Sequence, residues 1–161
     1  MDFNERLQKA LDRGHRTSDA RARAETEKKL NEQEIQRLHT QYRLEISERI
    51  EKCLQQVADN LPGFRFETLV GEKGWGAAIS RDDVEITPGQ GRTNYFSRLE
   101  MVIMPMTKYK VLDLAAKGTI RNKEFFRRNH YQPLQEVDLT SFTELIDLWS
   151  LEYAELYAAK S

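Results

Sequence analysis

Residues 31–62 read NEQEIQRLHTQYRLEISERIEKCLQQVADNLP, and this stretch decides the fold. Its large apolar residues recur at a mean spacing of about 3.7, at Ile35, Leu38, Tyr42, Ile46, Ile50, Leu54, Val57 and Leu61. Such a spacing places one apolar stripe along an α-helix. A left-handed coiled coil would need a spacing of about 3.5. The stripe therefore predicts a helix that lies on a globular body rather than one that winds around its own copy.

After Pro62 the hydrophobic period changes to two, which is typical of half-buried strands. Strands are expected at 64–70, 75–86, 95–103, 109–116 and 120–131, with a break or bulge at Arg81–Asp83. Turns are expected between them, including one at Lys117-Gly118. Because the connections are short, four or five such strands predict an antiparallel meander.

A C-terminal helix is expected at 141–159, where Ser141 and Glu144 form the pattern of a capping box. Its stripe contains Phe142, Leu145, Ile146, Trp149, Tyr153, Leu156 and Tyr157, widened by Leu148 and Leu151. We expect Trp149 to be buried against the sheet, and Trp75, which lies between glycines beside a turn, to be more exposed. The predicted class is α+β: a long N-terminal helix, an antiparallel four- to five-stranded meander, and a C-terminal helix packed on the sheet.

Residues 1–30 are predicted to form an N-terminal helical arm. Residues 31–161 are predicted to form a single α+β domain, with the long helix at 31–61, the sheet at 64–131 and the last helix at 141–159. Asp2 and Glu5 favour the start of a short first helix, Gly14 favours its end, and Thr17–Asp19 offers a new cap. A helix of about eleven residues is unstable alone in water, so this one must dock on something.

A continuous helix from Ala20 to Asn60 would be about 60 Å long and would overhang a body made from the remaining residues. One interpretation is an arm that a second subunit covers. Its interface would contain Phe3, Leu7, Leu11, Ala20, Ala24 and Leu30. The other interpretation is a solvated helix, maintained by helix propensity and by charge pairs such as Glu25–Lys29.

The composition excludes several classes of protein. A net charge of −1 favours neither nucleic acid nor an acidic membrane as partner. No apolar run approaches the roughly 20 residues that a membrane span needs, and because the N-terminal stretch is charged throughout we do not expect it to be a secretory signal. Cys53 is the only cysteine, which excludes an internal disulfide and favours the reducing cytoplasm.

No residue pattern predicts a catalytic site, a metal site or a cofactor. His15, His39 and His130 fall on different expected elements, so no metal-ligand spacing exists. Cys53 lies on the buried side of the long helix, where a cysteine usually behaves as an inert hydrophobe. The glycines at 71–76 and 89–91 are followed by expected strands rather than helices, which indicates hairpin turns rather than phosphate cradles.

The segment from Thr107 to Tyr131 has seven Lys or Arg and two acids, a net charge of +5. Its possible anion-binding residues are Lys117, Arg121, Lys123, Arg127, Arg128 and His130. Cations and aromatics mixed in this way are similar in composition to platforms for single-stranded nucleic acid. The tail that follows, 132–161, carries −5, and the segment contains no RNP-like pattern. We therefore expect this charge to be largely neutralised and nucleic-acid binding to be weak at most.

The sequence favours a non-catalytic interaction or assembly module, a homodimer formed through the arm, with an unidentified protein partner and no membrane. The alternative is a ligand-binding domain. It would bind an anion or nucleic acid on strands 107–131, or an apolar ligand between sheet and helices, where Met101, Met104 and Met106 could form an adaptable wall. An enzyme is a third class, with no residue pattern in its favour.

Overall fold

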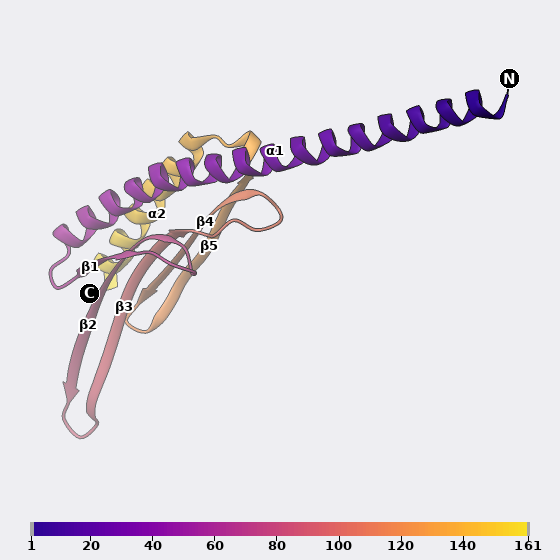
Figure 1. Ribbon diagram of the computed structural model, residues 1–161. Coiled ribbons are helices and arrows are strands. Elements are labelled where there is room, and N and C mark those ends of the chain that lie inside the picture. The colour runs from indigo at the N-terminus through magenta and orange to yellow at the C-terminus, as the bar shows by residue number, and fades with distance from the viewer. Residues whose placement is uncertain (1, 161) are drawn as a thin grey trace. The chain divides into compact units, whose positions relative to one another are not determined.

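A computed structural model describes residues 2–160 and, in that range, every side chain except that of Leu30. The elements in chain order are α1 (Phe3–Asn60), β1 (Arg65–Leu69), β2 (Trp75–Thr87), β3 (Gly91–Ile103), β4 (Val111–Ile120), β5 (Lys123–Pro133), a short 3-10 helix (Leu134–Glu136) and α2 (Leu139–Lys160) (Figure 1). This confirms the α+β class. The chain divides after Arg37 into two units, which are described separately.

From Phe3 onward the first unit is one helix, because α1 runs through Gly14 without interruption. The expectation of two helices separated at Gly14 is therefore wrong. The start is capped as expected, since the Glu5 amide donates to Asp2 Oδ1 at 2.9 Å. Thr17 caps no second helix, and its hydroxyl instead donates to the Arg13 carbonyl at 3.0 Å. One glycine costs a helix only about 1 kcal/mol relative to alanine, which the good helix formers around it can offset.

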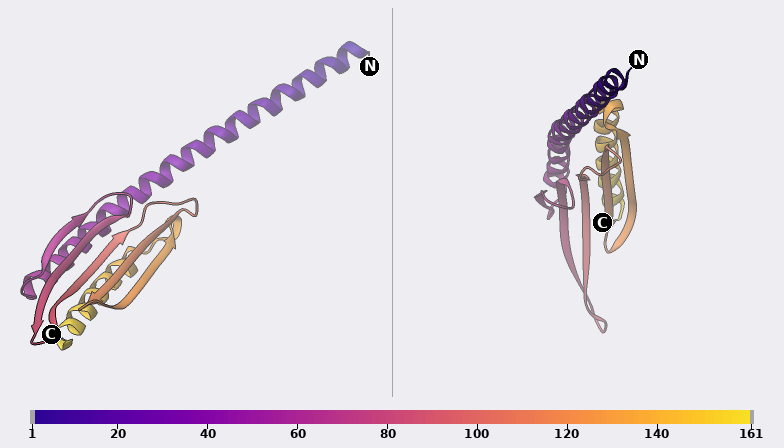
Figure 2. Two further views of the ribbon diagram at one scale, coloured as in Figure 1. Left: turned by 90° about the horizontal axis from the view of Figure 1, so that it is seen from below. Right: turned by 45° about the vertical axis from the view of Figure 1, so that its right-hand side comes forward.

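The second unit is a five-stranded antiparallel sheet in the order β1-β2-β3-β4-β5, so the predicted meander is confirmed. Both α2 and the part of α1 that follows Arg37 lie on the same face of this sheet, as Figure 2 shows. The sheet residues that face the helices alternate with outward ones, as the predicted period of two requires. The pairs Ile79–Leu99 and Leu114–His130 lie on the helix side.

Three strands are longer than the sequence predicted, because β3 begins at Gly91 rather than at Tyr95 and both β2 and β4 continue through residues expected to interrupt or end them. β2 is continuous through Arg81–Asp83, so the expected break is absent from it. The charges there are accommodated by ion pairs, Arg81 with Asp83 at 2.8 Å and Arg65 with Asp82 at 3.0 Å.

β4 continues through Lys117-Gly118, where a turn was expected, and the turn falls at Arg121-Asn122. Both turn residues have positive φ, 48° and 70°, as tight hairpin turns require. Gly118 serves packing instead, because a Cβ there would lie 2.9 Å from the Phe126 ring.

The start of α2 differs from the predicted capping box. Asp138 caps the helix, since its Oδ1 accepts the Thr140 amide at 3.1 Å. Ser141 already lies within the helix, and its hydroxyl donates to the Asp138 carbonyl at 2.7 Å. The predicted capping box of Ser141 and Glu144 is therefore wrong, because the helix begins two residues earlier than the pattern indicated.

The core lies between the sheet and the two helices. Its fully buried side chains include Ile46, Ile50, Leu54, Ile79, Leu99, Met101, Leu112, Leu114, Phe142 and Tyr153. Trp149 is only 7% exposed, which confirms its predicted burial. Trp75 is half-buried and lies under the Arg43 guanidinium, 4.2 Å from the ring centre.

Replacing the two tryptophans should give unequal losses of stability. We expect Trp149→Ala to lower the free energy of unfolding by roughly 3–5 kcal/mol, because it leaves a large cavity in the core. Trp75→Ala should cost less, since that ring is partly exposed. Urea titrations of both variants beside the wild type test this, and a larger loss for Trp75→Ala would reverse the assignment of core and surface.

His39 is a buried titratable residue on α1 within the second unit, and in the described part of the chain its Nε2 has no hydrogen-bond partner. Burial lowers the pKa of His39 below 6.5, against a smaller opposing effect of a backbone hydrogen bond at Met104. The folded protein therefore binds this proton less readily than the unfolded chain does. The contribution to stability is full above pH 6.5 and is lost as the pH falls towards the lower pKa of the folded state.

Acid should thus destabilise the wild type more than a His39→Leu variant. Below pH 6.5 the wild type should lose up to about 1.4 kcal/mol more per pH unit, which is the limit for one proton. Urea titrations between pH 7.5 and 5 measure this, with His15→Gln, a change at an exposed histidine, as the control. Parallel pH profiles for His39→Leu and wild type would contradict the role of His39.

Candidate functional site

The apolar residues of the predicted interface are exposed at the start of α1. Phe3, Leu7 and Leu11 are 77%, 40% and 47% exposed, and their spacing of four places them along one side of the helix. Ala20 and Ala24 are exposed too, but at 100° per residue they lie far round the helix from Leu11. The side chain of Leu30 lies outside the described residues. The structure therefore brings together three of the six residues, named here the arm stripe: Phe3, Leu7 and Leu11.

Three of the predicted anion-binding residues have partners within the chain. Arg128 of β5 makes a bidentate ion pair with Glu152 of α2, which lowers the pKa of that carboxyl. Arg121 pairs with Glu85 at 3.2 Å and lies 4.1 Å from the centre of the Tyr95 ring. The His130 ring packs on Phe142, with the ring centres 4.6 Å apart.

The other three predicted anion-binding residues do not form one site with Arg121, Arg128 and His130. Lys117 and Arg127 are exposed, face each other across β4 and β5, and by alternation lie on the other side of the sheet from Arg128. Lys123 lies 5.3 Å from the centre of the Phe125 ring, which Lys160 of α2 also approaches. The basic segment is thus divided between two faces of the sheet and does not form one platform.

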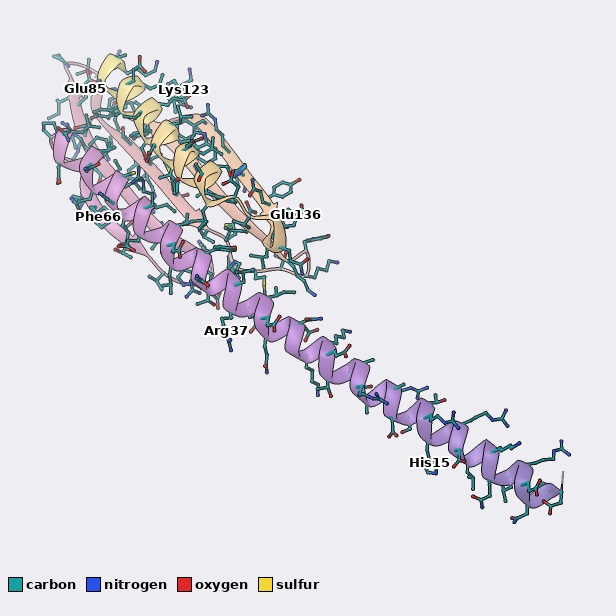
Figure 3. All side chains as sticks on the ribbon, turned by 90° about the horizontal axis from the view of Figure 1, so that it is seen from above. His15, Arg37, Phe66, Glu85, Lys123 and Glu136 are labelled. Carbon is teal, nitrogen blue, oxygen red and sulfur yellow. The ribbon has the colours of Figure 1, made fainter. Side chains whose placement is uncertain are left out.

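A groove of about 640 Å³ lies between α1 and α2, which run side by side over the sheet (Figure 3). We name it the α1–α2 groove, and it is lined by Arg49, Lys52, Cys53, Gln56, Val57, Asn60, Leu61, Asp147, Ser150, Leu151 and Ala154. A smaller groove of about 300 Å³ shares Arg49 and Lys52 and extends to Leu139 and Thr143. The two helices therefore leave a long depression on their outer surface, with apolar residues at both ends.

An ion pair between the helices lies in this groove. Arg49 binds Asp147 through two nitrogens, with Nη2 to Oδ2 at 2.6 Å and Nε to Oδ1 at 3.1 Å. This hydrogen bonding lowers the pKa of Asp147. The Cys53 thiol donates to Asp147 Oδ1 at 3.2 Å. Burial, and secondarily the Asp147 carboxylate, raises the pKa of Cys53 to about 11. The thiol is therefore protonated at neutral pH, which makes it a poor nucleophile.

Sequence reasoning missed this groove. Leu148 and Leu151 were expected to widen the buried stripe of α2, but they are 58% and 67% exposed, so that expectation is wrong. Leu151 lines the groove instead. The available signal was the width of the apolar surface on 141–159, which exceeds what one sheet face can cover.

Two absences hold for the residues that the structure describes. Between residues 2 and 160, no group of three His, Cys, Asp or Glu side chains could hold a metal ion. Neither described helix is both long enough and apolar enough to cross a membrane.

Cys53 should react slowly with a thiol reagent such as a disulfide-bearing chromophore. With a pKa of about 11, roughly one thiol in a thousand is ionised at pH 8. Asp147→Ala removes a carboxylate that raises this pKa and releases Arg49, so the reaction should become faster at a given pH. Rates measured from pH 7 to 10 test this, with Glu152→Ala as the control. Equal rates for Asp147→Ala and wild type would contradict the coupling.

Comparison with protein-family models finds no match to this chain, and comparison with curated proteins and with solved structures finds none either.

Proposed function

We propose that the protein is a non-catalytic interaction or assembly module that forms a homodimer through its N-terminal arm. The observation that carries the proposal is the arm stripe, three large apolar side chains exposed on one side of a helix. All described side chains from Asp2 to Lys29 are exposed. A helix in this state gains nothing from burial, so its stability in water rests on helix propensity and on charge pairs along its own surface.

Covering the arm stripe with a second subunit would remove its apolar side chains from water and so stabilise the arm. Each fully buried Leu or Phe side chain contributes roughly 1.5–3 kcal/mol. A contact related by a two-fold axis covers the stripe of each copy at once, so the gain counts twice per dimer. We also propose that the protein works in the reducing cytoplasm, which the single cysteine and its protonated thiol support.

The ligand-binding alternative has less support. Arg121 and Arg128 are engaged by acids. Of the exposed cations that remain in the segment, Lys117 and Arg127 face each other on the side of the sheet away from Arg128. Met101, expected to line an apolar cup, is fully buried in the core.

Introducing charge into the arm stripe should break the dimer. Leu7→Asp/Leu11→Asp should give a monomer at micromolar concentration, because burying either carboxylate is costly. Ala20→Asp/Ala24→Asp, which adds two exposed acids far round the same helix from the arm stripe, should remain dimeric. Light scattering and sedimentation on the full chain measure the mass, and a chain starting at Asn31 provides a second comparison. If the wild type is monomeric, or if Leu7→Asp/Leu11→Asp leaves the mass unchanged, the arm is not the interface.

A further inference from the structure

The proposed dimer requires a surface that receives the arm stripe, and the α1–α2 groove has suitable dimensions. A helix rises about 1.5 Å per residue, so Phe3 to Leu11 spans about 12 Å. The part of α1 that lines the groove, Arg49 to Asn60, spans about 16 Å. An amphipathic helix that binds a groove commonly does so through anchors three or four residues apart, which is the spacing of the stripe.

The apolar surfaces of the groove and of α2 are continuous. Val57, Leu61 and Ala154 line the groove together with Leu151. Leu148, one turn before Leu151 on α2, is also exposed. A guest helix in the groove would therefore cover the exposed leucines as well as the groove itself, and an apolar patch of this kind is typical of a binding site for another apolar surface.

The charges around the two surfaces are complementary. Arg6 and Arg13 follow one flank of the arm stripe, two turns apart. On α2, Glu144 lies four residues before Leu148 and Glu155 four residues after Leu151, so both acids share the face of the leucines. All four charged side chains are exposed, and in the described part of the chain none of them forms an ion pair.

We propose that the arm stripe of one copy lies in the α1–α2 groove of a second copy, beside Leu148 and Leu151, with Arg6 and Arg13 directed towards Glu144 and Glu155. The inference rests on the proposed function, since it names the surface that receives the arm. A two-fold axis makes the exchange reciprocal, so that each copy donates one arm and receives the other. Pairing of the two arms with each other is the competing arrangement.

A charge swap in the full chain tests the contact. Arg6→Glu/Arg13→Glu and Glu144→Arg/Glu155→Arg should each raise the dimer dissociation constant about tenfold or more, because like charges then meet across the interface. The variant with all four changes should return to within about threefold of wild type. Arg16→Glu/Arg23→Glu, the same charge change on the opposite side of the arm, is the control and should behave as wild type. Sedimentation at several concentrations measures the constants, and circular dichroism verifies that each variant is folded.

Cross-linking distinguishes the two arrangements. In a Cys53→Ser background, a tagged Leu7→Cys chain is mixed with an untagged Leu151→Cys chain under oxidising conditions. A disulfide between the two different chains is expected, and efficient linking of Leu7→Cys chains only to each other would overturn the inference.

The failures of the two proposals can be told apart. If Leu7→Asp/Leu11→Asp leaves the dimer intact, the arm is not the interface and both proposals fail. If that variant is monomeric while Glu144→Arg/Glu155→Arg dimerises as wild type does, the arm mediates assembly but binds elsewhere, and this inference alone fails.

Discussion

The structure depends on covering one apolar face of an antiparallel sheet. A meander of five strands presents alternate residues to each side, and the side that carries Ile79, Leu99, Met101 and Leu114 cannot remain in water. One helix is too narrow to cover five strands, so α1 and α2 together cover the apolar face of the sheet. Their buried stripes, with Ile50 and Leu54 on one helix and Phe142 and Tyr153 on the other, follow from this constraint. The bidentate pair of Arg49 with Asp147 joins the helices where they meet.

The sequence was most informative where one periodicity dominates. The long helix, the order of the strands and the burial of Trp149 all follow from the spacing of apolar residues. The ends of helices and strands were harder to predict, because one residue type can serve several structural purposes. Gly118 resembled a turn residue, yet it makes room for the Phe126 ring, while the turn itself uses Arg121 and Asn122. Gly14 resembled a helix end, but a single glycine does not overcome the propensity of its neighbours.

The groove between the helices was beyond the reach of sequence patterns for a different reason. Its two walls come from α1 and α2, whose facing residues are almost a hundred positions apart in the sequence. The space between them depends on where each helix packs on the sheet. The periodicity within either helix does not determine how far apart the two helices lie. The same holds for Cys53, whose burial was expected but whose hydrogen bond to Asp147 was not. The basic segment shows the converse, since its composition suggested one surface and strand alternation divided it between two.

The order of the elements along the chain has a consequence for synthesis on the ribosome. α1 is made before the sheet that buries its stripe, and α2, which completes the same layer, is made last. At roughly 5–20 residues per second, the strands and α2 follow α1 only after several seconds. During that interval Ile46, Ile50 and Leu54 have no sheet to lie on. The nascent helix therefore presents an apolar surface to the ribosome exit and to chaperones, whereas the meander, in which each strand pairs with its predecessor, can assemble as it emerges.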